Sequence, residues 1–200
     1  MGGGQPTMRV LVTGGTGFIG RQCADALEAA GHEVHTAHRD GGNGRDWRFD
    51  LLQEDHRQEI LERVAPDVIV TSAWEMTPDF WINPANAKWR DATFDLFLSA
   101  KKSGVQRFVG VGSCAEANPE TPYARAKDEC RRSIERSGHG ISWAWARIFM
   151  PIGIGEPPDK LVPSLAAKFA HGEAAEISSV KPSEIGSTSR MWVRRWPRWP

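Results

Sequence analysis

The sequence has a single tyrosine, Tyr123, among 200 residues, although it has nine tryptophans and eight phenylalanines. Its three cysteines lack paired spacing, which argues against a disulfide framework or a cysteine-based metal site and favours a reducing cytoplasm. Neither charge sign dominates: 25 basic and 25 acidic side chains create no overall field towards nucleic acid or a membrane surface. No apolar run approaches the roughly 18 residues of a membrane-spanning helix. These absences predict a globular cytoplasmic protein without a metal, nucleic-acid or membrane partner.

Short apolar runs alternate with helical patterns along the chain. Strands are predicted at residues 10–12, 33–37, 46–51, 67–73, 106–113 and 141–149. Helices are predicted at residues 18–30, 53–64, 86–102 and 121–137. Strands separated by helices predict an α/β fold, a Rossmann-type doubly wound parallel sheet with its ligand at the carboxyl ends of the strands.

The stretch TGGTGFIG joins the first predicted strand to the first predicted helix. It satisfies G-x-G-x-x-G, in which glycines permit a tight turn, close backbone approach to a pyrophosphate and tight packing of helix on strand. The helix N-terminus then offers free N–H groups to the phosphates. A plain flexible turn is the alternative, but the placement between strand and helix favours a dinucleotide site. Its predicted contacts are Gly14, Gly15, Thr16, Gly17, Phe18, Ile19 and Gly20.

The end of the second predicted strand bears on which dinucleotide binds. Sites for NAD often place an acid there for the ribose hydroxyls, but this chain has His38, followed by Arg39 and Asp40. Without the acid a 2′-phosphate is not repelled, and an arginine can pair with it. We therefore expect NADP or NAD, with a preference for NADP; the alternative is that His38 and Arg39 only decorate a strand end. Near the third strand, Asp50 is expected to bind the adenine amino group while Leu51 packs on the ring.

Tyr123 precedes Lys127 by four residues, so both side chains lie on one face of the same predicted helix. That helix follows the fifth predicted strand, which ends at Ser113. The three side chains are expected to face a cofactor held on the glycine turn. For the phenol to act as a base at neutral pH, its pKa must fall by roughly 3 units from about 10, and a nearby ammonium favours such a fall.

In these motifs the chain resembles the extended short-chain dehydrogenase/reductase family, specifically its NAD-dependent epimerase/dehydratase branch. The resemblance covers residues 8–177 and rests on TGGTGFIG, GVQRFVGVGS, PYARAK and ARIFMPIGIGE. It implies an NAD(P)-dependent oxidoreductase that acts on a nucleotide sugar by hydride transfer. It also implies that Tyr123 is the general acid/base, that Lys127 binds the nicotinamide ribose and lowers the tyrosine pKa, and that Ser113 holds the reacting oxygen. Pro151 is a further implied cofactor contact, and a homodimer is left open.

Several positions depart from the family pattern. The loop from Ser113 to Tyr123 is short, Ala117 stands where a tyrosine is frequent, and Trp89 stands where an asparagine is frequent. The fourth predicted strand ends in TSAW rather than in small apolar residues. Whether the tryptophans here line a substrate pocket or belong to the core or an interface is left open; they are Trp74, Trp81 and Trp89.

These patterns predict a flexible leader at 1–7, a dinucleotide-binding Rossmann domain at 8–155, the start of a substrate-binding portion at 156–177 and an atypical tail at 178–200. Residues 190–200 hold four arginines, three tryptophans and two prolines without helical or strand periodicity. One hypothesis is that an altered reading frame or a truncation leaves only a remnant of the C-terminal substrate domain. The alternative is an Arg/Trp tail that contacts a membrane or nucleic acid. A remnant would be an NAD(P)-binding protein or sensor with little or no turnover.

Overall fold

The computed structural model describes residues 6–42 and 44–174. Residues 1–5 of the predicted leader and the whole predicted tail at 178–200 lie outside these ranges. The chain separates into two compact units, one up to Gly153 and one from Ile154 onward. The four predicted segments and their boundaries stay predictions.

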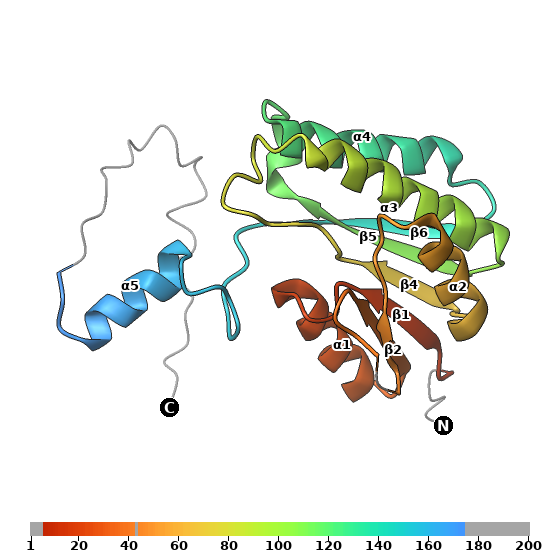
Figure 1. The fold of residues 1–200 in the computed structure, drawn as a ribbon, viewed down its shortest axis with the longest axis horizontal. Coiled ribbons are helices and arrows are strands. Elements are labelled where there is room, and N and C mark those ends of the chain that lie inside the picture. Colours follow the sequence, from red (N-terminus) through yellow and green to blue (C-terminus); the bar gives the residue numbers. More distant parts are fainter. Residues whose placement is uncertain (1–5, 43, 175–200) are drawn as a thin grey trace, which may run out of the picture. The chain divides into compact units, whose positions relative to one another are not determined.

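The first unit is built on a six-stranded parallel sheet with the strand order β3-β2-β1-β4-β5-β6 (Figure 1). This order reverses between β1 and β4, as in a Rossmann fold, so the predicted doubly wound α/β fold is confirmed. The strands are β1 (Arg9–Thr13), β2 (Glu33–His38), β3 (Asp46–Arg48), β4 (Val68–Thr71), β5 (Arg107–Ser113) and β6 (Ser142–Ile148). The helices are α1 (Phe18–Ala29), α2 (Glu54–Val64), α3 (Ala85–Lys102), the 3-10 helix η1 (Cys114–Ala117), α4 (Pro122–Ser137) and, in the second unit, α5 (Leu161–Ala170).

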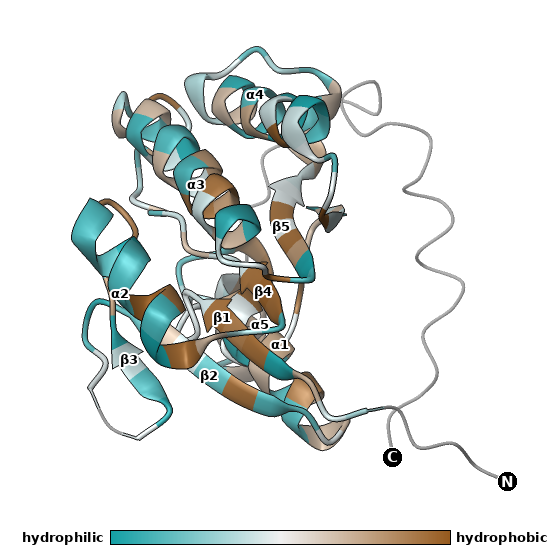
Figure 2. Ribbon diagram, turned by 90° about the vertical axis from the view of Figure 1, so that its right-hand side faces the viewer, coloured by the Kyte–Doolittle hydropathy of each residue, from teal (hydrophilic) through white to brown (hydrophobic). Residues whose placement is uncertain are grey.

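Alternate residues of each strand point to opposite faces of the sheet, and each face has its own buried cluster. Leu11 and Phe108 belong to the cluster that includes residues of α2, α3 and α4. Val12 and Val70 belong to the cluster that includes Ala24 of α1. Figure 2 shows the strands β1, β4 and β5 as largely apolar, whereas the helices carry both polar and apolar residues. The near-continuous apolar runs in the strands are therefore explained by burial on both faces.

Two glycines of β5 make room for a tryptophan of β6. A Cβ on Gly110 would overlap the six-membered ring of Trp145, and a Cβ on Gly112 would overlap its indole nitrogen. Neighbouring strands lie only about 4.8 Å apart, so the Trp145 side chain can cross β5 only where β5 has no side chains. The sequence FVGVGS thus shapes the surroundings of Ser113 at the end of β5.

The observed boundaries of α1 to α4 agree with the predicted helices to within one residue. Two elements were not predicted, η1 and α5. Pro163 lies in the first turn of α5, where a proline removes no intrahelical hydrogen bond, although a proline within an apolar run hides the helical pattern. No residue of α5 is buried.

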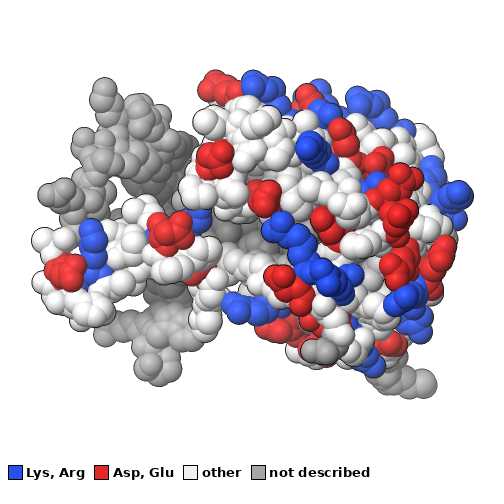
Figure 3. All heavy atoms as spheres, in the orientation of Figure 1, with Lys and Arg blue, Asp and Glu red and all other residues white. Residues whose placement is uncertain are grey.

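Figure 3 shows basic and acidic side chains interspersed over the face in view. Some form close surface ion pairs, such as Arg90 with Glu129 at 2.6 Å. Exposed pairs of this kind contribute about 0–1 kcal/mol each, so the stability of the fold depends mainly on the two apolar clusters. No helix in the described part of the chain is both long and apolar enough to cross a bilayer.

We expect Gly110→Ala to lower the free energy of unfolding by about 1–3 kcal/mol, because the new methyl group overpacks against Trp145. Urea unfolding followed by circular dichroism measures this change. Gly153→Ala is the matched control, because its Cβ would meet only the Phe18 ring, at 3.8 Å. Equal stability of the two variants would contradict the tight crossing of Trp145 over β5.

Candidate functional site

The glycine turn between β1 and α1 has a backbone conformation that favours glycine. Gly14 has a φ of +73°, in the left-handed region. Its N–H donates to the carbonyl of Ala37 at 2.8 Å, and its carbonyl accepts from the N–H of Gly17 at 2.9 Å. A Cβ on Gly14 would lie 2.8 Å from the backbone nitrogen of Ala73. The turn therefore lies tightly against the ends of β2 and β4, at the carboxyl edge of the sheet.

Ser72, in the unusual TSAW sequence, connects the end of β4 to the glycine turn. Its hydroxyl donates to the carbonyl of Thr13 at 2.8 Å, and the Thr13 hydroxyl donates to that of Thr71 at 3.0 Å. A Cβ on Gly20 would overlap both the Gly14 carbonyl oxygen and the Ser72 hydroxyl. The polar ending of β4 thus supports the turn.

A cavity of about 270 Å³ opens beside the glycine turn. The predicted cofactor contacts that line it are Gly14, Thr16, Gly17, His38, Arg39, Asp50 and Leu51. The predicted contacts outside its lining are Gly15, Phe18, Ile19, Gly20, Lys127 and Pro151. Further lining comes from the segment after β4, which the glycine pattern does not reveal: Ser72, Ala73, Trp74 and Glu75. A larger cavity of about 510 Å³ beside β3 and α2 is lined by none of the predicted site residues.

An acid from β3 lies beside the end of β2, where the sequence has none. Asp46 Oδ1 lies 2.7 Å from Nε2 of His38 and accepts a hydrogen bond from the Thr36 hydroxyl at 2.5 Å. The Nδ1 atom of His38 is buried and has no hydrogen-bond partner among the described residues. The His38 residue also lines the cavity. Sequence patterns missed Asp46, because its position depends on the pairing of β2 with β3.

Arg39 supplies a cation to the same cavity. Its guanidinium lies 3.5 Å from the carboxylate of Glu75, which also lines the cavity. The Arg39 side chain is 62% exposed, so this ion pair contributes about 1 kcal/mol at most to stability. Another anion can therefore readily replace the Glu75 carboxylate beside Arg39. The glycine turn, His38 and Arg39 together fit a dinucleotide, with or without a 2′-phosphate.

The structure brings the Ser113 hydroxyl close enough to Tyr123 to influence the pKa of its phenol. Burial of the phenol raises the pKa of Tyr123, the Ser113 hydroxyl lowers it, and the negative charge of Glu116 raises it. The net shift is upward, opposite to the direction that the resemblance implied. The physical reason is that burial acts most strongly on the phenol, while the ammonium of Lys127 is engaged elsewhere.

Three rings from the segment between β4 and α3 surround Tyr123 edge-on. The ring centroids of Phe80, Trp81 and Trp74 lie 5.0, 5.4 and 6.1 Å from that of Tyr123, with interplanar angles of 84–90°. Such edge-to-face contacts restrict the plane of the phenol. Trp81 is 45% exposed, whereas Trp89 is buried in the core and also lines the cavity. The sequence left the roles of three tryptophans open. In the structure Trp74 and Trp81 surround Tyr123, and Trp89 belongs to the core and also lines the cavity.

Lys127 is buried against one face of the Trp74 ring. Its Nζ donates to the carbonyl of Val111 at 2.8 Å and lies 3.8 Å from the centroid of the Trp74 ring. Burial lowers the pKa of Lys127 to about 8, although the nearby Cys130 and Glu116 act in the opposite direction. Trp74 contacts Lys127 and Tyr123 and also lines the cavity, so it links the cavity to the predicted catalytic residues.

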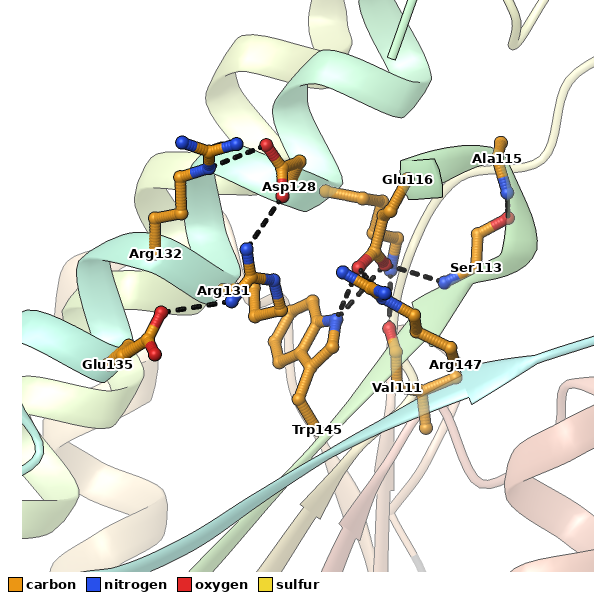
Figure 4. Close-up of polar contacts among 11 residues, drawn as sticks. Val111, Ser113, Ala115, Glu116, Asp128, Arg131, Arg132, Glu135, Trp145 and Arg147 are labelled. Carbon is orange, nitrogen blue, oxygen red and sulfur yellow. Dashed lines mark hydrogen bonds and ion pairs between the residues drawn. The ribbon is translucent and has the colours of Figure 1, made fainter. Parts of the chain in front are cut away.

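The side chain of Glu116 is fully buried. Figure 4 shows its carboxylate in contact with the backbone of Ser113 and the side chains of Trp145 and Arg147. Glu116 is not among the residues predicted from the sequence, although the spacing Ser113-x-x-Glu116 before a helix is the signal of a capping box.

No group of three His, Cys, Asp or Glu side chains within residues 6–42 and 44–174 is arranged to hold a metal ion. The cysteines Cys23, Cys114 and Cys130 form no disulfide. Burial raises the pKa of Cys130 to about 12, and a thiol of this kind is unreactive at neutral pH.

The glycine turn on a Rossmann sheet and the proximity of Ser113 to Tyr123 agree with a comparison of the sequence with protein families. The profile described as "NAD dependent epimerase/dehydratase family" matches residues 10–194, most of the chain. The chain belongs to this family. The match extends beyond residue 177, where the resemblance seen in the sequence fades.

Two curated proteins are similar in sequence to this member of the epimerase/dehydratase family. The 2'-dehydrokanamycin reductase of Streptomyces kanamyceticus is 37% identical over 117 residues, which cover 58% of this chain and 31% of that protein. The dTDP-6-deoxy-L-talose 4-dehydrogenase (NAD(P)(+)) of Kitasatospora kifunensis is 29% identical over an alignment of 200 residues, which covers 85% of this chain and 62% of that protein. The chain therefore spans less than two thirds of the length of either relative.

Solved structures of epimerase/dehydratase enzymes share the fold. The UDP-glucose 4-epimerase of Thermotoga maritima, solved with UDP-glucose, gives a TM-score of 0.75 at 22% identity, over 85% of this chain and 65% of that one. The Bordetella bronchiseptica enzyme WbmG, solved with NAD, gives a TM-score of 0.71 at 17% identity, over 88% of this chain and 63% of that one. At these identities the likeness shows the Rossmann fold alone.

We expect Lys127→Met to raise the free energy of unfolding at pH 7, because it removes a buried ammonium. A pKa of about 8 in the folded state, against 10.5 as the ordinary value, corresponds to a cost of about 3 kcal/mol below pH 8. Between pH 8 and 10.5 the unfolded lysine binds more protons than the folded one, so the cost disappears as the pH rises through this window. The gain from Lys127→Met should therefore be largest at pH 7 and smallest near pH 10.5.

Urea unfolding of the wild type and the variant at a series of pH values measures this gain. Lys102→Met, at an exposed position of α3, is the matched control and should show no such dependence on pH. A pH-independent difference between wild type and Lys127→Met would contradict the assignment of a strained, buried ammonium.

Proposed function

We propose that this chain binds NAD or NADP in the cavity at the glycine turn and that Ser113, Tyr123 and Lys127 carry out an oxidoreduction on a sugar, most simply a nucleotide sugar. The observation that supports this most directly is the cavity beside the glycine turn. It lies at the carboxyl edge of a Rossmann sheet in a chain of the epimerase/dehydratase family. Ligands of such sheets bind at this edge.

Bound NAD(P) would supply the acceptor or donor of a hydride. Tyr123 would exchange a proton with the hydroxyl or carbonyl oxygen of the sugar at its phenol oxygen. A phenol with a raised pKa is protonated at neutral pH, so it is ready to donate a proton to a carbonyl oxygen. Ser113 would hold the same oxygen by a hydrogen bond. Lys127, which the Trp74 ring covers in this structure, would bind the ribose hydroxyls once that ring moves aside.

The names of the relatives support a sugar as the substrate. The curated dehydrogenase is named for a dTDP-linked deoxysugar, and the Thermotoga maritima enzyme was solved with UDP-glucose. The reductase from Streptomyces kanamyceticus, 37% identical over 117 residues, is instead named for 2'-dehydrokanamycin. The second candidate substrate is therefore 2'-dehydrokanamycin or a related compound.

The cofactor assignment is tested by calorimetric titration with NADP and with NAD. We expect both to bind and NADP to bind more tightly, because Arg39 can exchange Glu75 for a 2′-phosphate. Arg39→Ala should weaken NADP binding by about tenfold, the effect of roughly 1.4 kcal/mol, and should leave NAD binding unchanged. Arg136→Ala, at the far end of α4, is the control. Tighter binding of NAD that is insensitive to Arg39→Ala would refute the preference, and binding of neither would refute the site.

The catalytic assignment is tested by Tyr123→Phe, which keeps the ring and removes the proton-transfer group. We expect this variant to lose turnover by a factor of at least about 100 and to retain its affinity for the cofactor. Lys127→Ala should weaken both, because it removes a ribose contact. The assay follows nicotinamide absorbance with UDP- and dTDP-linked sugars and with 2'-dehydrokanamycin.

Turnover by Tyr123→Phe at the wild-type rate would refute the catalytic role. Cofactor binding by the wild type without turnover of any compound in the panel would favour the alternative of an NAD(P)-binding protein or sensor. The two measurements together separate the binding claim from the catalytic claim.

A further inference from the structure

The Glu116 side chain is fully buried yet keeps a carboxylate in an ordered set of donors (Figure 4). The Ser113 N–H donates to Oε1 at 2.6 Å, and the Trp145 indole N–H lies 3.0 Å from both carboxylate oxygens. Nε of Arg147 donates to Oε2 at 3.0 Å. Both oxygens are therefore satisfied by donors from two neighbouring strands, β5 and β6.

The contact with Ser113 is one half of a reciprocal capping box. The hydroxyl of Ser113 accepts from the N–H of Ala115 at 3.2 Å, while the Glu116 side chain accepts from the N–H of Ser113. This arrangement fixes the backbone of Ser113 where the chain leaves β5 for η1. The Ser113 hydroxyl, held in this way, is also close enough to the Tyr123 phenol to lower the pKa of that phenol.

The clamp on Glu116 depends on sequence features far from it in the chain. Gly112 must lack a side chain, because a Cβ there would overlap both Oε1 of Glu116 and the indole nitrogen of Trp145. Arg147 is 39% exposed, so it approaches the buried carboxylate from the accessible side of β6. Replacing a buried ion pair by apolar residues is often neutral or stabilising in proteins. Capping a single turn of 3-10 helix therefore does not fully explain why the chain has a buried ion pair between Glu116 and Arg147.

We propose that Glu116 is a positioning residue of the Ser113–Tyr123–Lys127 site: its carboxylate, clamped by Trp145 and Arg147, orients Ser113 so that the serine hydroxyl meets the phenol of Tyr123. The catalytic relevance of this role rests on the proposed function. The geometric claim is independent of it, because it rests on the contacts of Glu116 with Ser113, Trp145 and Arg147.

The single tyrosine of the chain makes the test direct. In protein labelled with [13Cζ]tyrosine, one resonance reports the hydrogen bonding of Tyr123, with or without turnover. Its chemical shift is measured at pH 7.5 in wild type, Ser113→Ala, Glu116→Gln and the double variant. Glu116→Gln keeps the shape of the side chain but replaces one acceptor oxygen by an NH2 group, which faces the donors of Trp145 and Arg147.

If Glu116 acts through Ser113, the loss of the serine hydroxyl will shift the tyrosine resonance less in the Glu116→Gln background than in the wild-type background, because the remaining amide oxygen can still accept from the Ser113 N–H. Glu120→Gln, an exposed acid of the loop before α4 that accepts from Asn118, is the control. In its background Ser113→Ala should shift the resonance as it does in wild type. Additive shifts for Ser113→Ala and Glu116→Gln would overturn the proposal, because they would show that the two residues act on Tyr123 independently.

Arg147→Met provides a second test that spares the buried acid, in case Glu116→Gln does not fold. It removes the guanidinium that contacts the Glu116 carboxylate and leaves the capping box between Ser113 and Glu116 intact. We expect Ser113→Ala to cause a smaller tyrosine shift in this background than in wild type. A full-sized shift would overturn the proposed clamp. Because neither cycle needs cofactor or substrate, failure here is distinct from failure to find an oxidoreductase activity.

Discussion

The close approach of the glycine turn to the ends of β2 and β4 is the constraint on which the rest of the site depends. Gly14 and Gly20 have no room for a Cβ on the side facing Ala73 and Ser72. This contact, rather than flexibility, explains the glycines, and the Ser72 hydroxyl holds it by a bond to the carbonyl of Thr13. Because the strands are parallel, every residue that follows a strand on this edge is brought to the same place. His38, Trp74 and Ser113 come from different parts of the chain, but each lies at or just beyond the end of its strand.

The segment between β4 and α3 connects the cavity to the residues around Tyr123. Asn86 holds it in place: its side chain accepts from the Trp74 indole N–H at 2.8 Å and donates to the carbonyl of Phe80 at 2.6 Å. Trp74 then contacts Lys127 on its face and Tyr123 on its edge, while part of it lines the cavity. A ligand that displaced Trp74 would therefore disturb both Lys127 and Tyr123. One indole therefore borders the cavity and both titratable side chains.

Local sequence patterns predicted the features that depend on residues close together in the chain. Helix periodicity and stop residues gave the four main helices, and the glycine spacing located the turn. The four-residue spacing put Tyr123 and Lys127 on one helix face. Contacts between strands were beyond such patterns, because strand pairing sets them: Asp46 reaches His38 only through β2–β3 pairing, and Trp145 reaches Glu116 only over the glycines of β5. The predicted direction of the Tyr123 pKa shift was also wrong, because the burial that raises this pKa depends on the packed structure and not on the spacing of residues in the sequence.

The two buried charges at this edge are hard to explain by stability alone. Lys127 has no carboxylate in contact among the described residues; its ammonium rests on a carbonyl and an indole, and its pKa is lowered to about 8. Glu116 is fully buried a short distance away, close enough to act on both the lysine and the phenol. A core of apolar side chains would avoid the desolvation of both groups. The pKa values of Lys127 and Tyr123 are both shifted, and such shifts are typical of sites where protons are moved. In a chain of the epimerase/dehydratase family, this arrangement favours proton transfer at Tyr123 over a purely structural role for the lone tyrosine.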